Sequence, residues 1–302
     1  YHATTLVNDN LFLFGGYAPS RANDVWKLDL INYAWEEITT SGVTIPNLTR
    51  AIIAVNNNKM IILGGEQSSN YNNSIMELDL NTYVCRTVME TIPGGIEIYN
   101  NYYGYQSDVY NNKLYMLYKL DSNSFGLYTL DLTNYTLDVF PISTTTKIGY
   151  RENISLSIGN DTLYLFGGKK IEWEWYVSGS SAYYRMTDNR NTSTLQKVPL
   201  NTTVKGWSQR FKIFKPRAQH GPSEYGKYFK VCREFLIIPW HTNGDPTSGT
   251  NHNLNPGSGK VEVWKRSGTS YEKIQDIYMD QVVNNAYFGE KIFVYDDLYI
   301  SI

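Results

Sequence analysis

The sequence has 302 residues, of which 42% are hydrophobic, and it carries 27 basic and 29 acidic residues for a formal net charge of −2. A chain of this length and composition can bury a large core. Its balanced charge excludes the basic surface expected of a nucleic-acid-binding protein. No apolar run approaches the roughly 20 residues that a membrane-spanning helix requires.

An apolar run that ends in two glycines recurs along the chain. The first copy covers residues 11–16, and it returns at 60–65 and 163–168, while a copy at 114–119 lacks the glycines. The glycines are Gly15, Gly16, Gly64, Gly65, Gly167 and Gly168. An apolar run of four or five residues predicts a strand buried on both faces. Paired glycines fit a position that needs a close backbone approach or a positive φ.

Each copy lies between an Asn/Asp-rich turn and a second pattern. Residues 26–30 are matched by 76–80 and 128–132, with a looser fourth copy around 184–188. Nine residues beyond the first position of the first three copies come Trp35, Cys85 and Leu137. We expect Trp26 and Trp35 to fill the wedge between adjacent sheets. Four short strands per repeat of about 50 residues predict one propeller blade.

Gly15 and Gly16, followed by Trp26 and Trp35, resemble the kelch repeat, whose signature is a glycine doublet and two spaced aromatic residues. His2 and Arg50 stand where that family commonly has histidine and arginine. The resemblance covers residues 1–203, and the third copy departs from it. It implies an all-β fold, a β-propeller of about five to seven four-stranded antiparallel blades.

From residue 204 the repeat changes character. An aromatic residue is followed after 19 residues by Gly226 in one copy and after 18 residues by Gly289 in the next. Residues 204–302 thereby resemble FG-GAP repeats, the blades of integrin-α-type propellers. Some members of that family bind calcium, but the corresponding loop has only Asp245, and calcium sites use several oxygen ligands. We therefore expect no metal there.

The two halves are predicted to belong to one propeller. Residues 1–203 would supply kelch-like blades and residues 204–302 FG-GAP-like blades, with only residues 201–206 between them and no Pro/Ser-rich linker. Neither half has enough blades to cover its own sheet faces, so each is expected to cover the other. Both ends of the sequence read as strands, which suggests a fragment of a longer chain.

No residue is predicted to be catalytic or to hold a cofactor. The histidines are His2, His220, His241 and His252, without the clustered spacing of a metal site. Cys85 and Cys232 are the only cysteines and are read as separate thiols. A copper radical oxidase of the galactose-oxidase kind, which needs two His, two Tyr and a Cys, is kept as a distant alternative.

The segment at 169–176 is unusually rich in aromatic residues. Trp173, Trp175 and Tyr176 are the candidate ligand-binding residues, because two alternating tryptophans share a face of a strand and could form a ledge for a glycan or a protein. The alternative is an extended hairpin whose tryptophans pack on a neighbouring blade. Both readings stay open at this stage.

Seven Asn-x-Ser/Thr sequons are candidate glycosylation sites. They begin at Asn47, Asn72, Asn134, Asn153, Asn160, Asn191 and Asn201. Asn72 and Asn134 are the leading candidates because each lies in or beside a polar turn. The sequons favour an extracellular or cell-surface location over a cytoplasmic one.

The predicted function is that of a non-catalytic binding or structural module in a larger surface protein. Its loops at one face would recognise a protein or a glycan, and it could self-assemble into a larger structure. An intracellular kelch adaptor for protein–protein interaction is the first alternative. No nucleic acid and no membrane span are expected.

Overall fold

The computed structural model describes most of the first 140 residues and the strands of the rest. The described residues are 2–17, 19–68, 70–93, 107–121, 124–139, 148–149, 152–178, 181–191, 194–200, 209–212, 229–232, 234–240, 260–268, 270–277, 292–295 and 298–301. For part of the strands, including all of 167–178 and 181–191, only the backbone is described.

The chain divides into two compact units, which are described separately. Unit 1 comprises Tyr1–Tyr102, Gln106–Leu120 and Gly126–Phe140, and unit 2 comprises Tyr103–Tyr105, Asp121–Phe125 and Pro141–Ile302. The described residues form strands, turns and bends with no α-helix, which confirms the predicted all-β class. Within these ranges no helix is long and apolar enough to cross a membrane.

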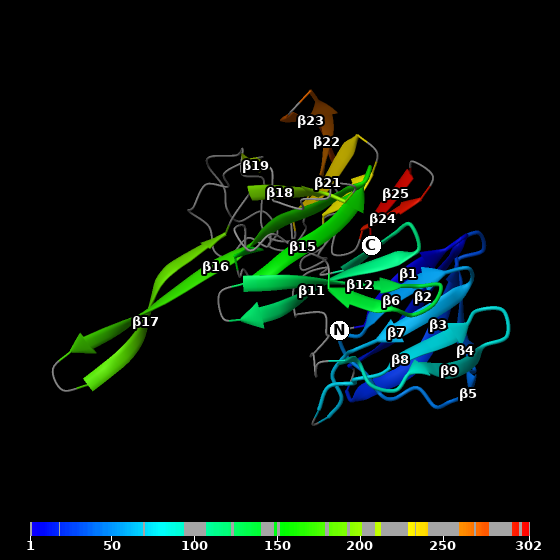
Figure 1. Cartoon of the computed structure of the whole chain (residues 1–302). Coiled ribbons are helices and arrows are strands. Elements are labelled where there is room, and N and C mark those ends of the chain that lie inside the picture. The colour runs from blue at the N-terminus through cyan, green and yellow to red at the C-terminus, as the bar shows by residue number, and fades with distance from the viewer. Residues whose placement is uncertain are drawn as a thin grey trace. The chain divides into compact units, whose positions relative to one another are not determined.

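Unit 1 contains antiparallel meanders, in which each strand pairs with the next along the chain (Figure 1). Sheet 1 consists of β1 (Ala3–Val7), β2 (Asn10–Tyr17), β3 (Arg21–Asp29) and β4 (Ala34–Ile38). Sheet 2 consists of β6 (Ile52–Asn56), β7 (Lys59–Leu63), β8 (Ile75–Asp79) and β9 (Val84–Met89), with β5 (Ser41–Gly42) parallel to β9. Sheet 3 consists of β10 (Ser107–Tyr110), β11 (Lys113–Asp121), β12 (Ser124–Asp131) and β13 (Leu137–Val139). β14 (Ile148–Gly149) pairs with Ser124 and Phe125 at the start of β12, and these residues all belong to unit 2.

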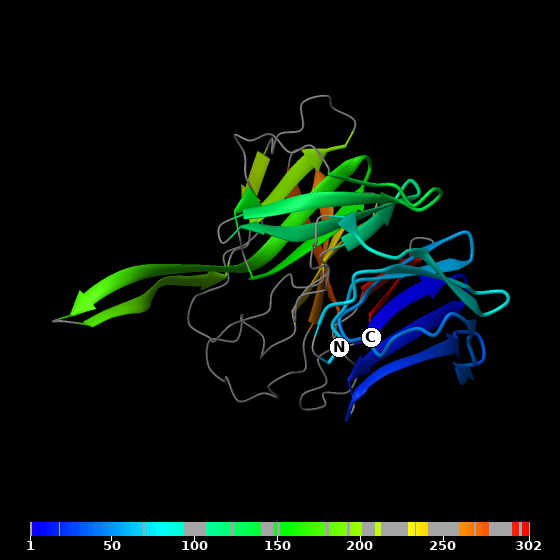
Figure 2. The ribbon, with the colours of Figure 1, turned by 60° about the horizontal axis from the view of Figure 1, so that its bottom comes forward.

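Unit 2 contains two further antiparallel sheets, of five and four strands, and one separate strand pair (Figure 2). Sheet 4 consists of β15 (Glu152–Gly159), β16 (Thr162–Ser178), β18 (Thr194–Pro199) and β19 (Gln209–Lys212), with β17 (Ser181–Asn191) on the far part of β16. Sheet 5 consists of β20 (Lys230–Cys232), β21 (Phe235–Trp240), β22 (Lys260–Ser267) and β23 (Ser270–Ile277). β24 (Ile292–Tyr295) pairs with β25 (Leu298–Ser301).

The Asn/Asp-rich turns join the first two strands in each of sheets 1 to 4. Asn57 and Asn58 have φ of 50° and 56°, and Asn111 and Asn112 have 48° and 57°. Two consecutive residues at positive φ make the type I′ hairpin turn, which Asn tolerates better than most side chains. The expected role of these residues as turn formers is therefore confirmed.

One backbone hydrogen bond ties this turn to the end of the third strand in every complete sheet. Its donors and acceptors are Leu30 N to Asp9 O, Leu80 N to Asn58 O, Leu132 N to Asn112 O, Leu200 N to Asp161 O and Arg266 N to Glu234 O, at 2.7–2.9 Å. The last of these lies in sheet 5, within the half that departs from the kelch pattern. Sheet 5 thus shares this hydrogen bond with the kelch-like sheets.

The predicted doubly buried strands form the core. In β7, Met60, Ile61, Ile62 and Leu63 are fully buried, and alternate residues pack toward opposite neighbours. Met60 and Ile62 join the cluster shared with sheet 1, while Ile61 and Leu63 join the cluster shared with sheet 3. In unit 2, Phe166 of sheet 4 meets Phe229, which directly precedes sheet 5, with ring centroids 5.5 Å apart.

The expectation for Trp35 was wrong. Its side chain is 51% exposed rather than wedged between sheets, and Trp26 is only half-buried. Trp35 pairs with Leu28 across β3 and β4, on the face of sheet 1 turned away from sheet 2.

The fourth copy of the second pattern was placed incorrectly at 184–188. Those residues belong to β17, which pairs with the far part of β16, whereas β18 takes the third place in sheet 4 by pairing with Thr162–Phe166. The β16–β17 extension is inserted after the glycine doublet, so the expected spacing falls inside it. Sheet 4 ends with β19 at Lys212, and the division of the chain at residue 203 stays a prediction.

Candidate interaction surfaces

One end of sheets 1 and 2, which we call the glycine-doublet end, is formed by residues 15–17, 19–21, 43–51, 64–68 and 70–74. Gly15 and Gly16 have φ of 57° and 116°, and a Cβ on Gly15 would lie 2.7 Å from the carbonyl oxygen of Leu48. The space is occupied because Gly16 N donates to Leu48 O at 2.9 Å. The glycines are therefore required by the close approach of the two loops, as the sequence predicted.

Ion pairs among Arg21, Arg50 and Glu66 connect the same loops. Glu66 accepts from Arg21 Nη2 through Oε1 at 2.9 Å and pairs with Arg50 Nη1 through Oε2 at 2.9 Å. Its backbone also exchanges two hydrogen bonds with Thr49, at 2.8 and 3.0 Å. Because all three charged side chains are at most 27% exposed, solvent screens these pairs less than it would on an open surface.

The fastened loops present a polar and aromatic surface. Tyr17 is 53% exposed at the end of β2, and the guanidinium carbon of Arg21 lies 6.0 Å from the centre of its ring. An exposed tyrosine beside immobilised charges is the type of surface on which protein contacts concentrate. Loops held this firmly lose little conformational entropy when they bind a partner.

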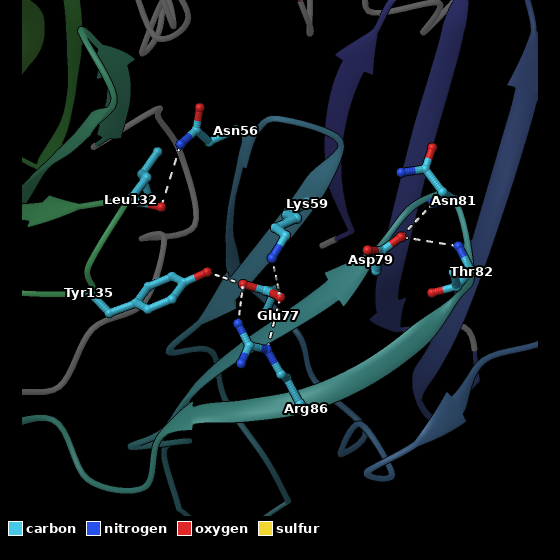
Figure 3. A network of polar contacts seen from close by, with 9 residues as sticks. All are labelled: Asn56, Lys59, Glu77, Asp79, Asn81, Thr82, Arg86, Leu132 and Tyr135. Carbon is cyan, nitrogen blue, oxygen red and sulfur yellow. Dashed lines mark hydrogen bonds and ion pairs between the residues drawn. The ribbon is translucent and has the colours of Figure 1, made fainter.

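Glu77, on the central strand β8, anchors a second polar network (Figure 3). Its carboxylate is 4% exposed and accepts from Lys59 Nζ at 3.0 Å and from Arg86 at 2.9 and 3.1 Å. Tyr135 lies between β12 and β13 of sheet 3, and its hydroxyl donates to Glu77 Oε2. This network joins two consecutive sheets, so its role is structural.

The pKa values in this network follow from its contacts. Burial alone would raise the pKa of the Glu77 carboxyl, but hydrogen bonds from Arg86, Tyr135 and Lys59 outweigh burial and lower it to about 2. Burial, together with the bond to Glu77, raises the pKa of Tyr135 to about 12. Glu77 is therefore ionised and Tyr135 protonated throughout the physiological range.

A related contact joins sheets 1 and 2. Lys27 occupies in β3 the place that Glu77 occupies in β8, and it forms an ion pair with Glu36 across the sheet. The hydrogen bond to Glu36 raises the pKa of Lys27, and Tyr83 of sheet 2 adds to this effect. Tyr83 packs against the core between the two sheets, as Tyr135 does one repeat later. We call this arrangement the tyrosine clamp.

The clamp tyrosines share an unusual backbone conformation that the sequence reading missed. Tyr33, Tyr83 and Tyr135 have φ of 54°, 57° and 61°. Four residues earlier, an aspartate closes each turn by accepting two backbone N–H groups, as Asp79 does from Asn81 and Thr82 at 2.8 and 3.1 Å (Figure 3). The spacing Asp-Leu-x-x-Tyr in all three copies could have revealed it.

Trp173, Trp175 and Tyr176 lie in the part of β16 that extends past its neighbours in sheet 4 and pairs with β17. The predicted hairpin is thus present. Opposite these residues stand Met186, Tyr184 and Tyr183. Because successive strand residues alternate between faces, Trp173 and Trp175 share a face and Tyr176 belongs to the other. The three candidates do not form one continuous ledge.

The sequons differ in accessibility. Asn47, Asn134 and Asn160 are exposed. Asn72 is only 5% exposed, and its amide donates to Gly64 O at 3.1 Å and Ser74 O at 3.2 Å, so a glycan there would have to displace these contacts. Asn153 and Asn191 are described by backbone alone, and Asn201 lies outside the described residues.

The structure describes only some of the remaining chemistry-bearing residues. His2 is exposed, whereas His220, His241, His252, Gly226 and Gly289 lie outside the described residues. In the described part of the chain no three His, Cys, Asp or Glu residues are grouped to hold a metal ion. Cys85 is a free, buried thiol in the core, where burial raises its pKa to about 11, with the Glu77 charge adding to the shift.

Comparison with protein families identifies the class. Residues 1–168 match the model of the KLHDC2/KLHL20/DRC7 Kelch-repeats domain. The match covers more than half of the chain, so the chain belongs to the kelch-repeat family. The four-stranded sheets described above are accordingly blades of a kelch β-propeller, a fold that mediates protein–protein interaction.

Similar individual proteins are much longer. Proteins named Leucine-zipper-like transcriptional regulator 1 from Pongo abelii, Mus musculus and Homo sapiens are each 24% identical to the chain over 159 residues. The matched region is 50% of this chain and 19% of each relative. The similarity therefore concerns about a fifth of each relative.

Proposed function

We propose that the chain is a non-catalytic interaction module that binds a partner protein at the glycine-doublet end of sheets 1 and 2. The observation that carries the proposal is the immobilised loop pair there, in which Glu66 binds Arg21 and Arg50, and Arg21 lies beside the exposed ring of Tyr17. A surface that is already ordered can bind without the entropy cost of folding its loops.

Site-specific photocrosslinking tests this assignment. A photoreactive phenylalanine analogue is placed at Tyr17 and, as the matched control, at Ile31, which is 70% exposed in the turn at the opposite end of sheet 1. Crosslinking in cells is expected to capture one defined protein from position 17 and not from position 31. The same adducts from both positions, or no protein adduct from position 17, would contradict the proposal.

The cellular setting is a separate part of the proposal. Exposed sequons at Asn47, Asn134 and Asn160 support a glycosylated surface or extracellular protein. An intracellular adaptor is the second candidate, favoured by the relatives named as transcriptional regulators and by the burial of Asn72. Intact mass of the native protein before and after glycosidase treatment separates them, because only the surface protein would lose mass.

A further inference from the structure

The extension of β16 and β17 is a two-stranded ribbon beyond sheet 4. Pairing of β15 with β16 ends at Lys169 and pairing of β18 ends at Phe166, whereas β17 pairs with Lys169–Ser178 (Figure 1). Among the described strands, β17 packs substantially against β16 alone. An isolated two-stranded hairpin is at best marginally stable in water, so the ribbon requires a covering surface.

The register divides the ribbon into two unlike faces. One face holds the pairs Trp173–Met186, Trp175–Tyr184 and Val177–Ala182. The other holds Glu174–Arg185, Tyr176–Tyr183 and Ser178–Ser181. From Trp173 onward, beyond the bulge in the register, the first face carries no charged residue and a single hydroxyl group, and the second carries one residue of each charge, two tyrosines and two serines. We call the first face the tryptophan face. It is the more apolar of the two, so its exposure to water is unfavourable.

We propose that the tryptophan face binds the same face of a second copy of this chain. Aromatic residues bury about 150–250 Å² each. Trp173, Trp175 and Tyr184 of two copies could therefore bury roughly 900–1,500 Å² of surface in total. The aliphatic residues of the face would add to this area. A stable, specific interface begins at about 1,200 Å². The area of the tryptophan face thus falls in the range where stable dimers begin.

The chemistry of the face favours a second copy over other occupants. A glycan needs several hydrogen-bonding groups beside the stacking rings, and beyond the bulge this face offers only the Tyr184 hydroxyl and two indole N–H groups. A charged peptide would find no complementary charge. Two copies related by a two-fold axis near the Trp175–Tyr184 pair place apolar residues against apolar residues along Trp173–Val177 and its β17 partners.

The molar mass of the 302-residue chain in solution tests the proposal. Light scattering after size exclusion is expected to give a dimer at micromolar concentration. The double variant Trp173→Ser/Trp175→Ser should have half that mass, whereas the matched variant on the other face, Tyr176→Ser/Tyr183→Ser, should stay dimeric. A monomeric wild type, or equal masses for the two variants, would overturn the proposal.

Crosslinking provides a second test that does not depend on the tryptophan variants folding. Facing sheets lie about 10 Å apart, so a bismaleimide of that span should join two copies through Tyr184→Cys and not through its neighbour Tyr183→Cys. Equal yields from the two variants would refute the face assignment. A monomeric result would leave binding at the glycine-doublet end untouched, because that surface belongs to sheets 1 and 2.

Discussion

Sheets 1 and 2 come from similar sequence repeats, yet they are buried differently. In sheet 2 both faces of β7 are fully covered, and Glu77 is clamped by a tyrosine from sheet 3. In sheet 1 one face packs on sheet 2, whereas Trp35 on the other is 51% exposed and the clamp tyrosine Tyr33 is 78% exposed. The clamp residue of each repeat thus acts on the preceding sheet, so a repeat's stability depends on its neighbours.

The largest expected effect is a difference in stability loss between core substitutions in sheet 2 and in sheet 1. Leu63→Ala removes a fully buried side chain of sheet 2 and should cost about 2–5 kcal/mol of unfolding free energy. Leu13 of sheet 1 is only half-buried, so Leu13→Ala should cost distinctly less unfolding free energy. Urea denaturation of both variants measures the difference. Equal losses would mean that both faces of sheet 1 are covered to the same extent as those of sheet 2.

The next effect concerns the clamp tyrosines. Tyr135→Phe leaves the buried carboxylate of Glu77 without one donor and should cost about 1–3 kcal/mol. Tyr33→Phe, the same change at the equivalent exposed position of sheet 1, should stay within about 0.5 kcal/mol of wild type. Thermal melting compares them. A similar loss at Tyr33 would show that its hydroxyl also has a buried acceptor.

Acid should weaken the clamp between sheets 2 and 3. The pKa of Glu77 is about 2 in the folded chain and about 4.5 when unperturbed, so its contribution is present above pH 4.5 and is lost as the pH falls toward 2. The stability difference between wild type and Glu77→Gln should therefore shrink from pH 6 to pH 2.5. A difference that is constant over this range would contradict the ionised network.

The smallest effect is expected at the turns. Asp79 accepts two backbone N–H groups, and these bonds lower the pKa of its carboxyl, so Asp79→Ala should lower the melting temperature slightly at neutral pH. The control is Glu90→Ala, an exposed carboxylate outside any regular strand. Differential scanning calorimetry can detect the change. An unchanged melting temperature for Asp79→Ala would remove the aspartate from the account of the repeat.

The sequence predicted the blade architecture because glycine doublets and Asn turns have local causes. Gly15 is required by a backbone approach and Asn57 by a positive φ, and both signals can be read from residue type. The exposure of Trp35 could not be read in this way, because it depends on which sheet lies beside it. The place of β18 was also missed, because an inserted ribbon shifted the spacing and Pro199 stands where the other copies have aspartate.

The site was predicted less fully than the fold. Trp173 and Trp175 were singled out correctly as a pair on one face of a strand, but their partners Met186 and Tyr184 became evident only from the register of β16 and β17. The clamp was missed because Glu77 and Tyr135 are 58 residues apart and belong to different repeats. Contacts between repeats depend on how sheets stack, which a single repeat does not encode.

A double-mutant cycle between Glu77 and Tyr135 tests most directly whether the clamp couples consecutive sheets. Urea denaturation of Glu77→Ala, Tyr135→Phe and the double variant should give a coupling energy of about 0.5–3 kcal/mol, as expected for directly bonded groups. The matched cycle of Glu77→Ala with Tyr33→Phe should be additive within about 0.5 kcal/mol. Additivity in the first cycle, or equal coupling in both, would contradict the account.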